Sequence, residues 1–182
     1  MSPHTRNALV LPLALCAGLT LSMATPAFAA EQPHPFVLTA YPTVAGGHDL
    51  LAGRYPAALQ QLRGRTNPAA LDAAAVSANR CVALSMTSQW HAAQTACDTA
   101  VREASDARLD RPTWAVWSSV EGDKRLAAAY ADRGVMRWLS HDHAGAQQDF
   151  ARARTLSPDS GFVTRNLVAL KFHGTEVHPR GS

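Results

Sequence analysis

A recurring register of helical segments constrains the fold of this chain more than any other feature. Three segments that each follow a turn carry an alanine in the same early position, at Ala58, Ala93 and Ala146. Seven residues further on come Arg65, Ala100 and Ala153, and the residues four positions after the alanines are Leu62, Cys97 and Phe150. Positions four and seven residues apart lie on one face of a helix. The pattern therefore predicts helices that each present the same face to a neighbour.

Composition favours helices throughout. Alanine dominates, while β-branched and aromatic residues are sparse, which is typical of helices and not of sheets. Between breakers such as Asn67-Pro68 and Ser157-Pro158, we expect short helices joined by turns. Residues 108–121 show no helical pattern, and Gly122 follows as a breaker, so an irregular insert is expected over about 106–124. The expected helices begin with a short one from His48, which ends before the separator Gly53-Arg54-Tyr55. The others cover residues 57–65, 71–87, 91–107, 123–139, 144–156 and 161–172.

One unit of the pattern matches a known repeat closely. Residues 127–158, AAAYADRGVMRWLSHDHAGAQQDFARARTLSP, resemble a tetratricopeptide repeat. The large, small, small, aromatic, small and proline positions of that motif are occupied by Tyr130, Gly134, Ala146, Phe150, Ala153 and Pro158. The small residues would let two helices approach closely, and the aromatic ring would fill the gap between them.

The other units match less completely. The second matches at Cys81, Leu84, Trp90, Ala93 and Ala100, but it has Cys97 where an aromatic residue is usual and lacks the closing proline. The first is degenerate in its opening helix. The resemblance covers residues 43–172 and implies an all-α solenoid of about three helix pairs with a C-terminal capping helix. The alternative is an ordinary helical bundle whose many alanines match the motif by chance.

The two ends of the chain read as parts outside this domain. A basic start, an apolar run over 8–23 and the closing Ala27-Phe28-Ala29 are typical of a signal peptide cleaved after Ala29. A lipoprotein anchored at Cys16 is disfavoured because Leu15 precedes it. We expect a periplasmic or secreted protein with no membrane span. Residues 30–42 carry three prolines and are expected to form an extended leader, and residues 173–182 a flexible tail.

Two cysteines, Cys81 and Cys97, remain after cleavage. An even pair in an exported chain is more often a disulfide than a metal site or a nucleophile. The repeat register implies that both cysteines face the seam between the two helices of the second unit, where the backbones come close enough to be bridged. The alternative is two buried free thiols.

Motifs for chemistry are absent from the sequence. No nucleophile elbow, phosphate loop, HExxH or CxxC occurs, so we expect neither an enzyme nor a cofactor. The one ligand-like cluster, His141-Asp142-His143, is better explained as a polar turn between helices than as a metal site. Acidic and basic residues are interspersed, with a formal net charge of +3, so nucleic acid is not an expected partner.

The resemblance implies a concave groove lined by the first helix of each pair. In tetratricopeptide proteins, residues two before the small position often bond the backbone of a bound peptide. That column holds Asn79, Asp132 and, in the capping helix, Asn166. Alternatively, Asn79 and Asn166 bond neighbouring backbone of the domain itself. The apolar side chains expected beside the column are Val82, Met86, Val135, Trp138 and Leu139.

These features favour an exported adaptor that binds a peptide or protein partner through the groove. The alternative is a structural or assembly component of the cell envelope, which binds through its outer face or through the insert with Trp114 and Trp117. The occupancy of the groove discriminates between them. A groove filled by the insert or by the leader would favour the structural component.

Overall fold

The computed structural model describes residues 34–63, 70–109 and 116–174, which belong to a unit that begins at His34. Within these ranges all regular structure is α-helical, which confirms the expected all-α class. The helices are α1 (Gly47–Leu51), α2 (Tyr55–Leu62), α3 (Ala70–Met86), α4 (Trp90–Leu109), α5 (Val116–Leu139), α6 (His143–Leu156) and α7 (Gly161–Gly174). The expected signal peptide lies outside the described residues. No helix in these ranges combines the length and the apolar character that a bilayer crossing requires.

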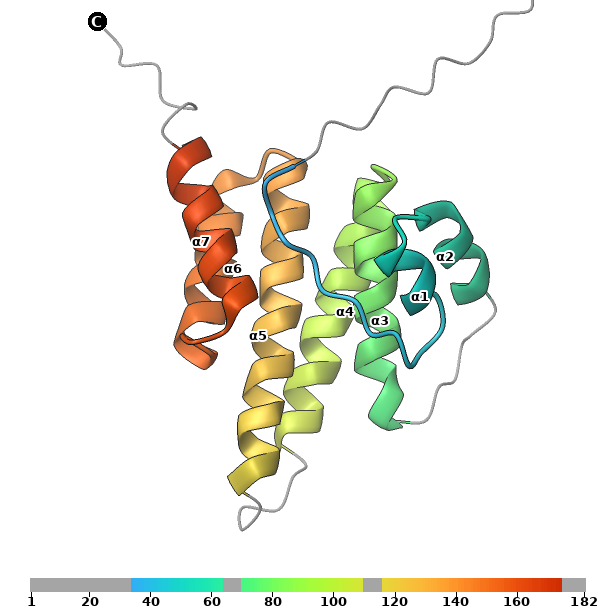
Figure 1. Ribbon diagram of the computed structural model, residues 1–182, viewed down its shortest axis with the longest axis horizontal. Helices are drawn as coiled ribbons and strands as arrows, with labels where there is room; N and C mark the ends of the chain where they lie inside the picture. Colours follow the sequence, from blue (N-terminus) through green and yellow to red (C-terminus); the bar gives the residue numbers. More distant parts are fainter. Residues whose placement is uncertain (1–33, 64–69, 110–115, 175–182) are drawn as a thin grey trace, which may run out of the picture. The chain divides into compact units, whose positions relative to one another are not determined.

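Helices that are neighbours in sequence pack against each other. The largest contacts join α3 to α4 and α5 to α6, and α4 also packs on α5. Figure 1 shows α3, α4 and α5 as long rods side by side, with α1 and α2 beside α3 and the shorter α6 behind α7. Helix α7 contacts both α5 and α6. Two connections contain a residue with a left-handed backbone, Ser88 (φ 55°) and His141 (φ 68°), which reverses the chain within a few residues.

The described helices differ from the expected ones at the insert and at the tail. Helix α4 continues to Leu109 and α5 begins at Val116, so much of the stretch expected to be irregular is helical. Gly122, expected to be a breaker, lies inside α5, because a single helical glycine costs only about 1 kcal/mol and tertiary packing can offset it. Helix α7 continues to Gly174, into the expected tail. Trp114 and the side chain of Trp117 lie outside the described residues.

Small residues form the seams between the helices. Ala93, Ala146 and Ala153 are fully buried, and Phe150 lies in the α5–α6 seam with 1% exposure. At Gly134, an added Cβ would lie 2.9 Å from Cε1 of Phe150, closer than real contacts allow. The missing side chain of Gly134 therefore makes room for the aromatic ring. Of the remaining motif residues, Tyr130 is half-buried, and Pro158 follows the end of α6 at Leu156.

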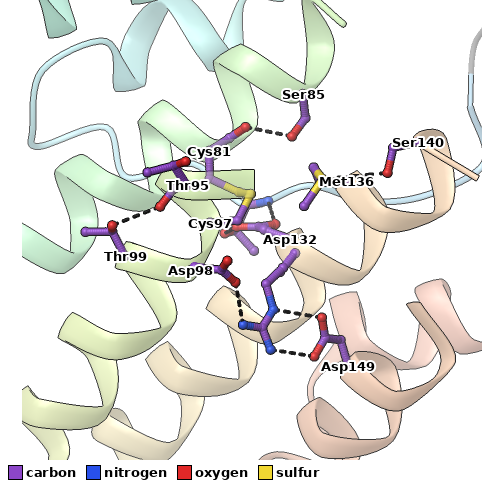
Figure 2. The surroundings of a disulfide bond; sticks show 12 residues. Cys81, Ser85, Thr95, Cys97, Asp98, Thr99, Asp132, Met136, Ser140 and Asp149 are labelled. Carbon is purple, nitrogen blue, oxygen red and sulfur yellow. Dashed lines mark hydrogen bonds and ion pairs between the residues drawn. A yellow bond between two sulfur atoms is a disulfide. The ribbon is translucent and has the colours of Figure 1, made fainter. Parts of the chain in front are cut away.

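The seam between α3 and α4 is closed covalently. Cys81 and Cys97 form a disulfide with a Cα–Cα distance of 4.7 Å, which confirms the expected bridge. Both residues are buried. Figure 2 shows the bond running between the two helices. In the seam between α5 and α6, the ring of Phe150 occupies the place in the register that Cys97 holds here.

A buried ion cluster joins α4, α5 and α6 (Figure 2). The carboxylate of Asp149, fully buried, accepts two hydrogen bonds of 2.8 Å from Arg133 and a third of 2.8 Å from Arg137. Arg133 also donates to Asp98 at 2.8 Å. Burial by itself would lower the pKa of Arg133, but the two carboxylates outweigh it and raise the pKa. The cluster satisfies both charges of the Asp149–Arg133 pair inside the protein.

Candidate functional site

The described part of the leader, residues 34–42, lies across α5 and α3 and also contacts α7. In Figure 1 the blue segment that precedes α1 crosses α5 and then reaches α3. Residues 36–41 form neither helix nor strand, run as a drawn-out segment in Figure 1, and contact side chains of α3, α5 and α7. We call the surface beneath them the leader-binding face. It consists of Asn79, Val82 and Met86 of α3, Val135, Asp132 and Trp138 of α5, and Asn166 of α7.

Two asparagines hold the backbone of the leader at its ends. The side-chain oxygen of Asn166 accepts from the amide of Val37 at 2.6 Å, and its Nδ2 donates to the carbonyl of Val37 at 2.9 Å. Asn79 makes the same pair of bonds with Tyr41, at 2.9 and 3.0 Å. Both asparagine side chains are fully buried. Each amide thus satisfies both polar backbone groups of one leader residue, whatever that residue's side chain.

The middle of the leader is held by Asp132 in a different way. Oδ1 of Asp132 accepts from the amide of Thr39 at 2.8 Å, and Oδ2 accepts from the Thr39 hydroxyl at 2.5 Å. When ionised, the carboxylate has no proton to donate and cannot bond the Thr39 carbonyl as an asparagine would; when protonated, it can donate to the Thr39 hydroxyl. The hydroxyl supplies the second bond instead. At this position the face therefore contacts the side chain of the leader as well as its backbone.

The spacing of these contacts follows from the extended conformation. The bonded residues Val37, Thr39 and Tyr41 alternate along the leader, and backbone groups two residues apart in an extended strand point to the same side. Their three partners come from three helices, α7, α5 and α3. The packing of these helices thus sets the distances between the polar side chains to match one extended strand.

Apolar side chains of the leader fill the space between the polar contacts. Phe36 is 5% exposed, and its ring centroid lies 5.7 Å from that of Phe150, with the rings stacked, and 5.5 Å from that of Trp138. Leu38 packs against the same cluster and also, like Ala40, against the cluster that contains Val82 and Met86. The side chains expected to form apolar pockets in the groove therefore pack with the leader, including Val135 and Leu139.

Burial sets the electrostatics of this face. Asp132 is 1% exposed, and none of the ion pairs found in the described residues involves it. Burial raises the pKa of Asp132 from 3.8 to about 7, against the opposing effect of the two hydrogen bonds from Thr39. Burial and the nearby Asp132 charge likewise raise the pKa of Tyr41. An unpaired buried carboxylate is costly in its charged form, so this position favours the neutral acid.

A tight turn connects the leader to α1. The amide of Val44 donates to the carbonyl of Tyr41 at 3.3 Å, and Nδ2 of Asn79 also donates to the carbonyl of Ala45 at 3.1 Å. Gly47 passes so close to Tyr41 that an added Cβ would lie 2.0 Å from the Tyr41 carbonyl oxygen. Asn79 therefore holds both sides of the turn, and the carboxyl end of the leader is the more firmly attached one.

The histidine-rich cluster serves as a helix start. Asp142 is the N-cap of α6, and its side chain accepts from the amide of Gly145 at 2.9 Å. The ring of His143 lies edge-on to that of Trp138, with centroids 4.3 Å apart. These contacts agree with the expected polar turn. In the part of the chain that the structure describes, no group of acidic, histidine and cysteine side chains could hold a metal ion.

The sequence analysis selected residues of this face and named the insert and the leader as possible fillers without deciding between them. Asn79, Asp132 and Asn166 all bond residues 37–41 of the same chain, so for Asn79 and Asn166 the alternative holds that they bond backbone of the domain itself. A signal was present, since Phe36-Val37-Leu38-Thr39-Ala40-Tyr41 is rich in residues that favour extended structure. Comparisons with known proteins give no matching family model, no matching curated protein and no matching solved structure.

Proposed function

We propose that this chain is a non-enzymatic structural or assembly component of the bacterial cell envelope, built on a tetratricopeptide-like array whose groove its own leader closes. The occupancy of the leader-binding face carries the proposal. Three buried polar side chains of the face bond the leader, and the leader's own Phe36 is buried against the face. A face filled in this way is not open to a partner, so the partner contact of the resting protein falls on the outer surface.

Two further observations support the repeat architecture and the compartment. The helix pairs α3–α4 and α5–α6 each bury small residues of the motif in their seams, and α7 covers the second pair as a capping helix would. The Cys81–Cys97 disulfide fits an oxidising compartment, as does the N-terminal segment that ends at Ala29. Both features agree with a periplasmic or secreted protein.

The outer side of α7 is the part of the surface best suited to a partner. Val168 and Phe172 are 49% and 68% exposed and lie one helical turn apart, on the same side of the helix. The outer helix of a repeat array normally presents a polar face to water. Exposed apolar side chains at that place therefore favour contact with another protein.

A capture experiment tests this assignment. Tagged protein purified from the producing cell serves as bait in an envelope extract, and the captured proteins are compared for the wild type and for Val168→Asp. We expect Val168→Asp to lose the partner while its melting temperature stays within about 2 °C of the wild type, because surface substitutions rarely change stability by more than about 0.5 kcal/mol. Gln148→Asp, on the exposed side of α6, is the matched control.

One observation favours the adaptor as a second candidate function. Asn79 and Asn166 contact only backbone atoms of the leader, so they would hold any extended polypeptide equally well. The same capture experiment separates the two functions. Capture that survives Val168→Asp but is abolished by an excess of the peptide HPFVLTAYP, residues 34–42, would assign the captured partner to the leader-binding face and rule out the contact at α7.

A further inference from the structure

We propose that the leader-binding face is a strand-exchange site. When the leader withdraws, the face takes from another polypeptide an extended segment with the pattern aromatic-x-x-Ser/Thr-x-aromatic, which the leader carries as Phe36, Thr39 and Tyr41. This binding mode goes beyond the outer-surface contact proposed above and does not depend on it.

The three polar side chains of the face recognise different parts of the bound segment. Asn166 and Asn79 bond the backbone of Val37 and Tyr41 and are indifferent to sequence. Oδ1 of Asp132 takes the amide, and Oδ2 needs a partner from the side chain above it: a donor when the carboxyl is ionised, an acceptor when it is protonated, and a hydroxyl can be either. Serine and threonine are the residues whose short side chain places a hydroxyl next to its own amide.

A residue without a hydroxyl would be disfavoured over Asp132. With valine at that position, the buried Oδ2 would lose its hydrogen-bonding partner in either protonation state, while the methyl groups kept the volume of the side chain nearly unchanged. An unsatisfied buried carboxylate oxygen costs enough free energy to weaken binding by about tenfold or more. Asp132 is therefore a specificity-determining residue of the face.

An aromatic anchor defines the amino end of the pattern. The ring of Phe36 stacks on Phe150 and lies against Trp138, in a cluster that also contains Val135 and Ala169. At the other end, Tyr41 packs against the cluster of Ala78 and Leu126. Both aromatic side chains lie in contacts that a smaller residue would leave partly empty, so the ends of the strand select for rings.

The position of the leader allows it to leave. It forms the amino end of the described unit, so it can peel away from Phe36 toward Tyr41 without threading through the fold. Its central contact is the buried carboxylate of Asp132, which has no cationic partner among the described ion pairs. The turn from Val44 to Gly47 and its bonds to Asn79 can stay in place during such an opening.

The attached leader has a large advantage over a free peptide. A segment tethered by a short linker acts at an effective concentration of about millimolar. A free peptide therefore competes poorly with an intact leader, and weakening the leader should uncover the site. The double variant Phe36→Ala/Thr39→Val removes the anchor and the hydroxyl from the leader and leaves every residue of the leader-binding face unchanged.

Binding of a labelled peptide to the full chain tests the proposal. The probe is fluorescein-labelled HPFVLTAYP, titrated with the wild type and with the double variant by fluorescence anisotropy. We expect the double variant to bind the peptide at least about tenfold more tightly than the wild type. Replacement of Thr by Val in the peptide should weaken its binding to the double variant by about tenfold. A scrambled peptide is the control.

Two outcomes would overturn the proposal. One is a double variant that keeps its helical circular dichroism yet binds the peptide no better than the wild type. The other is equal binding of the Thr and Val peptides. If the double variant does not fold, hydrogen exchange of the wild type decides the question. The proposal requires the amides of Val37 and Thr39 to exchange through local opening, faster than those of α3, and exchange only through global unfolding contradicts it.

Discussion

Asp132 makes the stability of this protein dependent on pH at the scale of a single residue. The pKa of its carboxyl is about 7 in the folded chain and 3.8 as a model value, so the folded state binds more protons between these limits. The proton on the Asp132 carboxyl stabilises the folded state fully below about pH 4, and this contribution is lost as the pH rises through about 7. The protein therefore loses this contribution near neutral pH.

We predict that Asp132→Asn removes this dependence. An asparagine can accept from the amide of Thr39 and donate to its hydroxyl, so it mimics the neutral acid at every pH. Urea denaturation between pH 4.5 and 8 should show the unfolding free energy of the wild type decreasing relative to the variant, with the variant the more stable protein at pH 8. Asp159→Asn, at an exposed position, controls for the change in net charge. Parallel curves for the wild type and Asp132→Asn would refute the assignment.

The buried carboxylate of Asp149 has the opposite character, because it is paired. We predict that Asp149→Ala lowers the unfolding free energy by about 3–5 kcal/mol, since it leaves the guanidinium groups of Arg133 and Arg137 without their buried partner. Asp98→Ala removes a bond to the same Arg133 from a side chain that is 47% exposed, and should cost about 0.2–1 kcal/mol. Equal losses in urea denaturation would contradict this ranking.

Sequence reasoning could find one of these two carboxylates and not the other. The resemblance to the repeat motif predicts Asp132 in one column with Asn79 and Asn166, and all three bond the same segment of the chain. Asp149 and Arg133 are 16 residues apart on different helices, and nothing in their spacing distinguishes them from solvated surface charges. Burial decides the difference, and burial of a charged residue depends on how α5 and α6 are rotated against each other.

At the scale of helices, the seam between α5 and α6 depends on one missing side chain. We predict that Gly134→Ala destabilises the protein by about 1–2 kcal/mol. A gain of about 1 kcal/mol in helix propensity is outweighed by the contact with the buried ring of Phe150. Gly122→Ala, in the same helix, meets no atom closer than 3.5 Å and should stabilise by up to about 1 kcal/mol. Thermal melts compare the stability of the two variants with that of the wild type. Stabilisation by both substitutions would show that Phe150 can move aside to make room for the added methyl group.

The seam between α3 and α4 depends on a covalent bond instead. Cys81 and Cys97 are separated by 16 residues. Closing a loop of that length lowers the conformational entropy of the unfolded chain and so stabilises the folded state by about 3 kcal/mol. We predict that reduction, or Cys81→Ala/Cys97→Ala, lowers the unfolding free energy by about this amount. The reduced wild type and the double variant should then unfold at similar urea concentrations. A reduced protein as stable as the oxidised one would show that packing alone holds the seam.

The bounds of a helix could be predicted where a helix breaker and a capping motif occur together. Where only a breaker was present, the prediction was wrong. The turn before α6 combines Ser140-His141-Asp142 with a good N-cap, and the expected start was one residue from the observed one. Helix α5 begins at Val116, several residues before the start that Gly122, as a breaker, predicts. A glycine ends a helix only where the chain must turn, and here Gly122 itself lies against Arg108 of α4.

At the scale of the whole molecule, the sequence alone did not determine where the leader binds. An extended, proline-containing segment was expected at residues 30–42, and so was a column of polar side chains able to bond a peptide. The connection between them depends on the length from Tyr41 to α1 and on the turn at Gly46 and Gly47, where Gly46 has a φ of 77°. That turn returns the leader onto α3, so that the chain supplies the occupant of its own face.

The position of the leader gives the expected processing site a structural consequence. Cleavage after Ala29 would leave residues 30–33 ahead of His34, where the described unit begins, so the leader would form the amino end of the mature protein. We predict that protein purified from the producing cell starts at Ala30 and contains no free thiol, because export delivers the Cys81–Cys97 pair to an oxidising compartment. Intact mass spectrometry, with and without reduction before alkylation, measures both properties. A species that retains residues 1–29, carries an acyl group at Cys16 or alkylates at two cysteines without reduction would contradict the assignment to the periplasm or the extracellular space.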